Sequence, residues 1–352
     1  MPSTLISLRD ETFESLTADI PFIKHVVHHD QLMEDSVALL AKVFPEWDSK
    51  DLKLAQCKDG ITNKLVACRN TKLETTVLVR AYGKNSEKII DRKHELQTMA
   101  GLARLSLCPR LYARFDNGLV YGYIPGRVVQ PAEMGTPHVS KLIAVMLARW
   151  HMVDLPGSQD PQLFITLNNW LNDIPDTFSN PNKQKQFVEQ FNMNEIKAEL
   201  ELLESELTLL DSPVVFSHND LLSANVIYNE ETDEISFIDY EYGTYNFRGF
   251  DIANHFCEYA GFECDYSRYP SKEAQIKWFR TYLEKFSQSI PKEKELESLY
   301  IEVSKFSLAS HFYWGLWALV QASISDIDFD YMTYARMRFD EYYKNKEAYL
   351  AL

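Results

Sequence analysis

The stretch "VVFSHNDLLSANVIY", Val214–Tyr228, places three polar side chains, His218, Asp220 and Asn225, within eight residues of one another and directly after an apolar run. Asp220 and Asn225 are five residues apart. This spacing matches a catalytic-loop pattern in which the aspartate orients a hydroxyl nucleophile and the asparagine holds Mg²⁺. Alone the pattern is weak, because "HND" also fits a turn whose Asn and Asp side chains bond local backbone groups. The flanking sequence decides between the two interpretations.

The residues that follow this stretch predict a β-hairpin. The apolar "VIY" is followed by the polar "NEETDE" and then by "ISFID", which is the pattern of two short strands joined by a turn. Because a hairpin that folds about residue 232 brings its open ends together, Asn225 and Asp239 are expected to lie opposite one another. An amide oxygen and a carboxylate oxygen that converge suit one hard cation. We therefore predict that Asn225 and Asp239 hold Mg²⁺ and that Asp220 acts as a base.

Upstream of the catalytic-loop pattern, the sequence predicts an antiparallel sheet. Over Leu54–Ala81 the short apolar runs "KLVAC" and "TTVLVRAY" alternate with polar turns, which is typical of strands. Arg80 lies in the second run, and its guanidinium can donate hydrogen bonds to phosphate oxygens. The segment "SEKIIDRKHELQTMAGLARL" predicts a helix that packs on the sheet, with Ser86 as its N-cap. Glu95 on this helix either orients Arg80 or is a solvated surface carboxylate.

The segment "DGITNKL", Asp59–Leu65, lies between polar sequence and a predicted strand. Its position means that its backbone can cover the phosphates of a nucleotide. Gly60, Thr62 and Asn63 are therefore predicted nucleotide contacts. The segment lacks the G-x-G-x-x-G pattern, so it is a weak signal by itself.

Together these patterns predict an α+β architecture in three regions. Residues 1–50 resemble helical pieces punctuated by "DIPF" and "VFPEWD" and are interpreted as a helical extension, either an outer layer or a contact in a homodimer. Residues 51–123 form the sheet lobe, and residues 124–352 form a large helical lobe. Two helical faces of that lobe are predicted from apolar spacing: Ile196, Leu200, Leu203, Leu207 and Leu210, and Ile276, Phe279, Leu283 and Phe286.

The composition of the chain excludes several classes of function. Its 352 residues are 45% hydrophobic, enough for one large core or two fused lobes. The 36 Lys and Arg against 51 Asp and Glu give a net charge of −15, so binding to nucleic acid or acidic membranes is not expected. Five cysteines without a C-x-x-C pair predict neither a disulfide framework nor a zinc site. The absence of a signal-peptide pattern or membrane-length apolar run predicts a cytoplasmic protein without membrane insertion.

Three longer motifs carry a resemblance to a known family. "SHNDLLSANVIY", "FIDYEYGTYNFRGFDIANHFCEYAGF" and "ASHFYWGLWALVQA" resemble the choline/ethanolamine kinase family from about Lys58 to Lys346, and "GITNKL" with "HNDLL" resembles its ethanolamine kinases most. The resemblance implies a protein-kinase-like bilobal fold and transfer of the ATP γ-phosphate to ethanolamine, the first step of phosphatidylethanolamine synthesis by the CDP-ethanolamine route. Matched by position, Asp220 is the base, Asn225 and Asp239 bind Mg²⁺, and Arg80 contacts phosphate. Choline kinases usually carry Gln where this chain has Leu222, a departure that argues against choline.

An amino-alcohol site needs carboxylate or aromatic faces around its ammonium end. In "FDIANHFCEY", Asp251, His255 and Glu258 fall on one helical face, and Trp314 and Trp317 are three residues apart on another predicted helix. Without the resemblance, such a tryptophan pair suggests ordinary core packing. The resemblance instead implies a cation pocket formed by five residues: Tyr242, Glu258, Trp314, Trp317 and Tyr334.

Two residues are interpreted as structural support, and two alternative functions remain open. Asp251 is expected to support the catalytic loop, and His218 to bond backbone groups. The same chemistry with another acceptor gives a choline kinase, a dual choline/ethanolamine kinase or an enzyme for an aminoglycoside-like polyamine. A catalytically weak kinase-like interaction module is the alternative from another class. Such a module is expected to lack Asp220, Asn225 or Asp239, and the chain retains all three.

Overall fold

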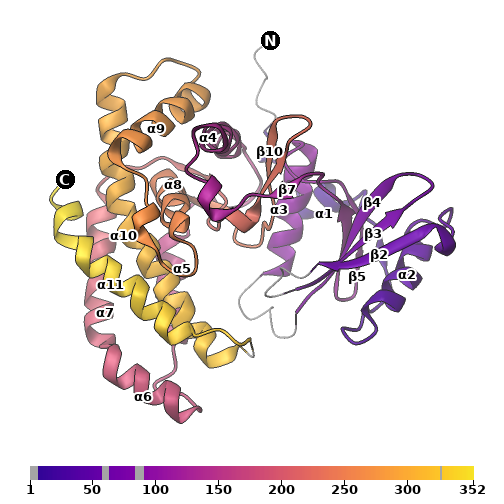
Figure 1. Cartoon of the computed structure of the whole chain (residues 1–352), viewed down its shortest axis with the longest axis horizontal. Coiled ribbons are helices and arrows are strands. Elements are labelled where there is room, and N and C mark those ends of the chain that lie inside the picture. The colour runs from indigo at the N-terminus through magenta and orange to yellow at the C-terminus, as the bar shows by residue number, and fades with distance from the viewer. Residues whose placement is uncertain (1–6, 58–62, 84–90, 326) are drawn as a thin grey trace. The chain divides into compact units, whose positions relative to one another are not determined.

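The computed structural model describes residues 7–57, 63–83, 91–325 and 327–352, and the chain divides into two compact units (Figure 1). The first unit comprises Met1–Gly126, Asp154–Pro156 and Ser236–Tyr242. The second comprises Arg127–Val153, Gly157–Ile235 and Gly243–Leu352. The first unit is built on a sheet, and the second is mainly helical.

The first unit contains a six-stranded sheet in the order β1-β5-β6-β4-β3-β2. All neighbouring pairs are antiparallel except β1 and β5, which are parallel. The strands predicted over Leu54–Ala81 are confirmed, with Leu65 opposite Arg80 in the β3–β4 register. The six strands are β1 (Phe22–Ile23), β2 (Leu52–Cys57), β3 (Lys64–Asn70), β4 (Thr75–Ala81), β5 (Leu111–Phe115) and β6 (Gly118–Gly122).

The N-terminal residues contribute to the hydrophobic core of the first unit. This segment contains α1 (Phe13–Thr17), α2 (Leu32–Val43) and the short turn η1 (Ser49–Asp51), and its strand β1 extends the sheet. Val27 and Leu39 are fully buried in one cluster with strand residues such as Val77. The segment therefore packs as part of this unit, although its sequence suggested only helical pieces.

Helix α3 (Arg92–Arg104) follows β4 in the chain and carries Glu95. Its N-cap is Asp91, whose side chain accepts hydrogen bonds from the backbone N–H groups of Lys93 and His94, and such a cap satisfies N–H groups that the helix cannot. The predicted N-cap, Ser86, lies outside the described residues. The first turn of α3 buries Glu95 almost completely, at 1% exposure, so this side chain is not a solvated surface carboxylate.

Gly118 of β6 allows close approach of the strand that carries Arg80. A Cβ atom at this position would lie 2.0 Å from the backbone oxygen of Arg80 and 2.4 Å from the ring of Phe115. A backbone oxygen in a sheet cannot move away without disturbing the ladder, so a side chain is excluded here. The sheet thus fixes the backbone from which Arg80 extends.

The second unit is organised around the long helix α10 (Glu293–Ile324). This helix packs against several others, including α8, α9 and α11, and most of its residues from Val303 to Ala322 are buried. A helix that is buried on all sides needs no polar stripe. The other helices of the unit are α4 (Pro137–His151), α5 (Leu163–Asp173), α6 (Pro181–Gln190), α7 (Met193–Thr208), α8 (Arg248–Cys257), α9 (Lys272–Ser287) and α11 (Tyr331–Leu350), with short turns η3 (Pro131–Glu133), η4 (Ser223–Asn225), η5 (Glu258–Ala260) and η6 (Tyr266–Arg268).

The two predicted helical faces differ in how well they match the structure. On α7 the buried residues are Ile196, Leu200, Leu203 and Leu207, which confirms that face, although the helix ends before Leu210. On α9 Phe279 and Leu283 are buried as predicted, whereas Ile276 and Phe286 are only partly buried. The buried face also includes Trp278 and Tyr282, whose rings stack at 5.4 Å.

Short strands frame the catalytic-loop pattern. Strand β8 (Val214–Ser217) pairs antiparallel with β11 (Thr244–Phe247), which leads into α8. Strands β9 (Val226–Asn229) and β10 (Glu234–Phe237) are neighbours in a sheet with β7 (Arg127–Val128). The predicted hairpin is therefore confirmed, with Asp233 in the left-handed region (φ 55°) at its turn.

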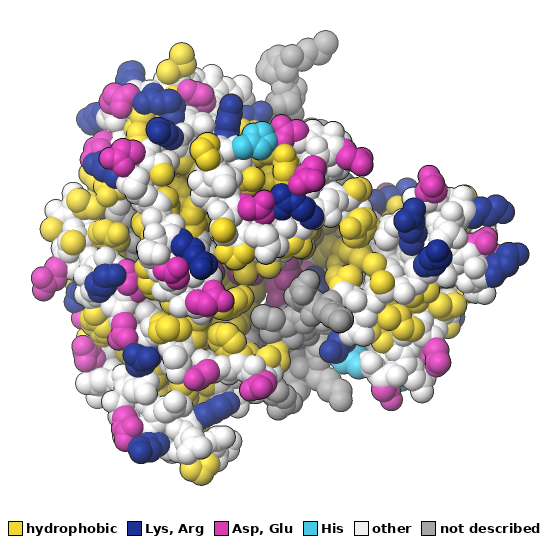
Figure 2. Space-filling view, viewed as in Figure 1, with side chains coloured by type: hydrophobic (Ala, Val, Ile, Leu, Met, Phe, Trp, Pro, Cys, Tyr) yellow, Lys and Arg dark blue, Asp and Glu magenta, His cyan; other side chains and the backbone are white. Residues whose placement is uncertain are grey.

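The surface drawn in Figure 2 shows acidic and basic side chains scattered among apolar ones over both units. The net charge of −15 is thus not gathered in one acidic patch on this face. All five cysteines are free thiols. Within the described ranges, no helix has the length and apolarity required to cross a bilayer.

Candidate active site

The loop after β8 is held by the carboxylate of Asp251 on α8. Asp251 Oδ2 accepts the backbone N–H of His218 at 2.8 Å, and Oδ1 accepts that of Asn219 at 2.7 Å. Asn219 adopts a left-handed backbone conformation (φ 63°), which Asn tolerates better than most residues. This conformation turns the chain so that Asp220 follows directly after two anchored N–H groups.

Two residues that sequence reasoning missed complete the support of Asp251. His151, at the end of α4, lies with Nε2 2.9 Å from Asp251 Oδ2 and with Nδ1 2.7 Å from the hydroxyl of Tyr282 on α9. Burial opposes ionisation of Asp251, but the hydrogen bond and charge of His151 outweigh it and lower the pKa of the carboxyl. No local pattern marks His151, because its partners lie 100 and 131 residues further along the chain.

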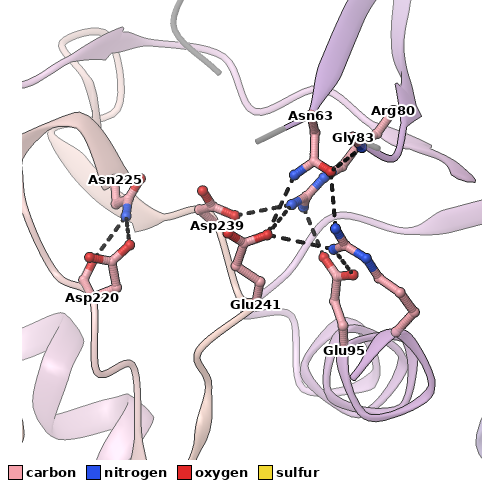
Figure 3. A network of polar contacts seen from close by, with 9 residues as sticks. Asn63, Arg80, Gly83, Glu95, Asp220, Asn225, Asp239 and Glu241 are labelled. Atoms are coloured by element: carbon pink, nitrogen blue, oxygen red, sulfur yellow. Dashed lines mark hydrogen bonds and ion pairs between the residues drawn. The ribbon is translucent and has the colours of Figure 1, made fainter. Parts of the chain in front are cut away.

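Asn225 is oriented by Asp220 (Figure 3). Its Nδ2 group donates to the backbone oxygen of Asp220 at 2.8 Å and to Asp220 Oδ2 at 3.0 Å. Because the amide nitrogen is engaged twice, the amide oxygen of Asn225 points away from Asp220. The five-residue spacing therefore brings the two side chains into direct contact and leaves the amide oxygen of Asn225 on the side away from Asp220.

His255, one turn after Asp251 on α8, contacts the same loop. Its Nδ1 lies 3.0 Å from the backbone oxygen of Leu221, a distance at which the ring N–H donates to the carbonyl. Complete burial lowers the pKa of His255 to about 4, against an opposing effect of the Leu221 hydrogen bond. The imidazole is therefore neutral at pH 7 and holds the loop through one fixed tautomer.

In the first unit, Arg80 lies at the centre of a buried ionic cluster (Figure 3). Its Nη1 is 3.0 Å from Glu95 Oε1, and its Nη2 is 2.8 Å from Glu241 Oε2 and 3.3 Å from Asp239 Oδ1. The side chain of Arg80 is only 6% exposed. Burial opposes its charge, but the three carboxylates outweigh this and raise the pKa of Arg80 well above its ordinary value.

Arg92 and Asn63 extend this cluster. Arg92 Nη1 bonds Glu95 Oε2 at 2.8 Å, and its guanidinium lies 4.2 Å from the ring centroid of Tyr82. Asn63 Oδ1 accepts from Arg92 Nη2 at 3.3 Å, and Asn63 Nδ2 donates to Glu241 Oε2 at 3.4 Å. Sequence reasoning anticipated Asn63 but missed Arg92 and Glu241. The other two predicted contacts in that segment, Gly60 and Thr62, lie outside the described residues.

Among the described residues, the cluster brings together three carboxyl groups and two guanidinium groups. Glu95, Asp239 and Glu241 lie within ion-pair distance of Arg80 or Arg92. Desolvation by burial, followed by the charge of Asp239, raises the pKa of Glu241 to about 7. Asp239, in the left-handed region at φ 64°, keeps a side chain that is 38% exposed. Its carboxylate is thus accessible to a ligand, whereas that of Glu95 is not.

The predicted opposition of Asn225 and Asp239 stays a prediction. Asn225 belongs to the second unit and Asp239 to the first. Tyr242, predicted for the cation pocket, also belongs to the first unit and is half-buried.

Four predicted pocket residues lie in the second unit, and the structure connects them in two pairs. Glu258 and Tyr334 both contact Arg338, whose Nη1 donates to Glu258 Oε1 at 2.9 Å and to the Tyr334 hydroxyl at 3.3 Å. The rings of Trp314 and Trp317 meet edge to face with centroids 5.4 Å apart. Sequence reasoning missed Arg338, although it lies one helical turn after Tyr334 on α11.

The sheet unit with its buried Arg80–Glu95 pair and the helical unit with its Asp220–Asn225 loop together have a protein-kinase-like fold. The profile of the family described as choline/ethanolamine kinase matches residues 54–343, and the chain belongs to this family.

Individual relatives agree with this family. The chain is 42% identical to a probable ethanolamine kinase A from Dictyostelium discoideum, over 86% of this chain and 88% of that protein. It is 41% identical to human ethanolamine kinase 1, over 91% of this chain and 73% of that protein. Among solved structures, it is similar to an ethanolamine kinase from Plasmodium vivax, with a TM-score of 0.81, 28% identity, and coverage of 90% and 89% of the two chains. A choline kinase from Cryptosporidium parvum gives a TM-score of 0.75 with 26% identity, over 90% and 96%.

Because His255 is buried as a neutral imidazole, we expect the protein to become less stable as the pH falls. Because its pKa is lowered from 6.5 to about 4 in the folded protein, the unfolded chain binds more protons below pH 6.5, and stability is lost as pH falls. Between pH 7.5 and 5, wild type should lose about 2 kcal/mol more free energy of unfolding than His255→Asn, which keeps an N–H donor for Leu221. Urea denaturation at the two pH values measures this difference. An equal loss in the two proteins would contradict the assignment.

Proposed function

We propose that this protein is an ethanolamine kinase, which transfers the γ-phosphoryl group of ATP to the hydroxyl of ethanolamine and releases phosphoethanolamine. This reaction would be the first step of phosphatidylethanolamine synthesis by the CDP-ethanolamine route. The observation that carries the proposal is the Asp220–Asn225 loop in a chain whose relatives of about 40% identity over most of its length are named ethanolamine kinases. We also propose a cytoplasmic location.

Asp220 is proposed to act as the general base. It is half-buried, its backbone follows two N–H groups anchored by Asp251, and its Oδ2 is held by Asn225. A carboxylate fixed in this way can accept the proton of the ethanolamine hydroxyl as the oxygen attacks phosphorus. His218 and Asp251 are assigned to the support of the loop.

The donors that we propose for Mg²⁺ fit this ion. Asn225 presents an amide oxygen because its nitrogen is turned toward Asp220, and Asp239 presents a partly exposed carboxylate. Oxygen atoms are the preferred ligands of Mg²⁺, which protein sites hold through one or two carboxylates together with the phosphates of the substrate. When bound, the ion would offset negative charge on the transferred phosphoryl group.

The buried cluster around Arg80 is proposed to hold the nucleotide phosphates. Glu95 fixes Arg80 through an ion pair that excludes solvent from both partners, so the guanidinium keeps one orientation. Backbone from the segment that contains Gly60, Thr62 and Asn63 is assigned to the same phosphates. A guanidinium held in place suits phosphate oxygens because its N–H groups form a planar fork.

The acceptor end is proposed to bind the ammonium group of ethanolamine through Glu258, Trp314, Trp317 and Tyr334, with Tyr242 from the first unit. Because Arg338 engages Glu258 Oε1, we assign Oε2 to a substrate N–H. A primary ammonium donates three hydrogen bonds, whereas the trimethylammonium of choline donates none and is held by aromatic faces. Glu258 therefore favours ethanolamine, and the tryptophans suit either cation.

The proposal is tested by coupled-assay turnover of the purified protein with ATP, Mg²⁺ and a panel of acceptors that includes ethanolamine, choline and an aminoglycoside. The expected result is preferential use of ethanolamine. A preference for choline would favour the choline kinase alternative. No turnover with any acceptor would favour the interaction module.

Replacing Asp220 by Asn should separate chemistry from nucleotide binding. The amide keeps the shape of the side chain but cannot accept the hydroxyl proton, so kcat should fall by roughly 10²-fold or more while the KM for ATP changes little. Steady-state kinetics with ATP varied at saturating ethanolamine measures both constants. A weaker affinity for ATP with an unchanged kcat would argue against the role of Asp220.

Replacing Asp239 by Ala should weaken the Mg²⁺-dependent binding of ATP. The variant loses one oxygen ligand, and ATP then approaches a protein of net charge −15 with less compensation. Titration of ATP at several Mg²⁺ concentrations should show that the variant needs more Mg²⁺ than wild type. Saturation at the wild-type Mg²⁺ concentration would exclude Asp239 as a ligand.

Replacing Glu258 by Gln should reduce the discrimination between ethanolamine and choline. An unpaired ammonium donor or pocket acceptor costs about 1 to 3 kcal/mol, so wild type should prefer ethanolamine by roughly ten- to a hundredfold in kcat/KM. The preference should shrink in Glu258→Gln, which carries no charge. Equal or better use of choline by wild type would reject the idea.

A further inference from the structure

A continuous set of hydrogen bonds inside the second unit joins the residues proposed to bind the ammonium group to the loop that carries Asp220. We call this set the buried network. Each of its side chains is at most 6% exposed. Its side chains are Asn254 on α8, Ser310 and Trp314 on α10, Tyr334 and Arg338 on α11, and Glu258 at the end of α8.

Asn254 is the branching point of the buried network. Its Oδ1 accepts from Trp314 Nε1 at 2.7 Å and from Ser310 Oγ at 2.8 Å. Its Nδ2 donates to the backbone oxygen of Asn219 at 3.0 Å. Asn219 immediately precedes Asp220, so one amide group contacts both a proposed pocket residue and the catalytic loop.

The second branch runs from Asn254 to the carboxylate of the pocket. Ser310 Oγ, which donates to Asn254, accepts from Arg338 Nη2 at 3.0 Å. Arg338 Nη1 then donates to Glu258 Oε1 and to the hydroxyl of Tyr334. The ammonium end and the hydroxyl end of the proposed acceptor site are therefore connected through Asn254, by side-chain bonds on one side and by the backbone oxygen of Asn219 on the other.

The chemistry of the partners explains why Asn is needed at this position. The indole N–H of Trp314 can only donate, and the backbone oxygen of Asn219 can only accept. A side chain between them must offer an acceptor on one side and a donor on the other, which fixes the orientation of the Asn254 amide. Since Asn254 is fully buried, a broken link would leave its partner groups without water to replace it.

We propose that Asn254 is a positioning residue, which sets the distance between the ammonium pocket and Asp220 and thereby selects amino alcohols of the length of ethanolamine. The inference rests on the proposed function. Phosphoryl transfer requires the hydroxyl to reach Asp220 while the ammonium is bound, so the spacing of the two ends determines which chain length reacts. A small displacement of one end is expected to lower kcat strongly.

The test compares ethanolamine with 3-amino-1-propanol, which is longer by one methylene group. Two variants interrupt the buried network: Asn254→Leu removes all three of its bonds, and Ser310→Ala removes the hydroxyl that links Asn254 to Arg338, while Arg338 keeps its bond to the Ser310 backbone oxygen. Ser307→Ala is the matched control, because Ser307 is a buried hydroxyl one turn away on α10 that bonds the backbone oxygen of Ser304. The measurement is the ratio of kcat/KM for the two alcohols in each protein.

Wild type and Ser307→Ala should prefer ethanolamine to the same degree. In both network variants the ratio should fall about tenfold or more, and the effect on kcat should be larger than the effect on KM. A merely structural role lowers the amount of folded enzyme and leaves the ratio unchanged, so an unchanged ratio overturns the inference. Equal use of both alcohols by wild type also overturns it. If Asn254→Leu does not fold, Ser310→Ala decides. Turnover of neither alcohol by wild type counts instead against the proposed function.

Discussion

The bond between the Asp251 carboxylate and two backbone N–H groups determines the form of the catalytic loop. The left-handed conformation of Asn219 is unfavourable for most residues, and the loop adopts it because both neighbouring N–H groups are satisfied by one buried anion. Asp251 remains an anion inside the protein because His151 bonds it and Tyr282 orients His151. Helices α4, α8 and α9 thus contribute to the position of a single residue, Asp220.

In the first unit, the buried charged groups are held by ion pairs. Arg80 is buried among three carboxylates, and removal of one partner from such a cluster typically costs about 3 to 5 kcal/mol because the remaining charge stays buried. The cluster has one carboxylate more than it has guanidinium groups, which agrees with the raised pKa of Glu241. On the proposed function, ATP adds further negative charge to this excess. A divalent cation that arrives with the nucleotide would restore the balance, and Asp239, at 38% exposure, is the most exposed of the three carboxylates.

Local patterns in the sequence were sufficient to predict elements whose residues are near one another in the chain. The strands around Arg80, the β9–β10 hairpin and the face of α7 all follow from periodicity over a few residues. The spacing of five between Asp220 and Asn225 marked both residues as candidates, but their direct contact is seen only in the structure. Strand β1 and the burial of Trp278 and Tyr282 on α9 were missed, because each depends on packing against distant segments.

The supporting residues of the site were missed for the same reason. His151, Glu241 and Arg338 have partners that lie 80 residues or more away in sequence, and periodicity carries no information about such contacts. For Glu95 the sequence predicted the helix but not the orientation of the side chain. Only the structure shows that Glu95 faces Arg80 and not solvent. Periodicity thus located several site residues, whereas their orientation depended on partners that it cannot identify.

Several residues that support the candidate site lie in the continuous motif "FDIANHFCEY", because they belong to helix α8 or follow it directly. Asp251, Asn254 and His255 lie on the face of α8 that contacts the catalytic loop, each through a different group, and Glu258 follows one turn later at the edge of the proposed ammonium pocket. A helix advances 1.5 Å per residue and is stiff over two turns. The spacing of the three residues on α8 and of Glu258, directly after its last residue, therefore fixes the positions of a loop contact and a pocket carboxylate relative to one another. Any insertion within "FDIANHFCEY" would rotate Glu258 away from Arg338 or Asp251 away from the loop, so the two ends of the site can only vary together.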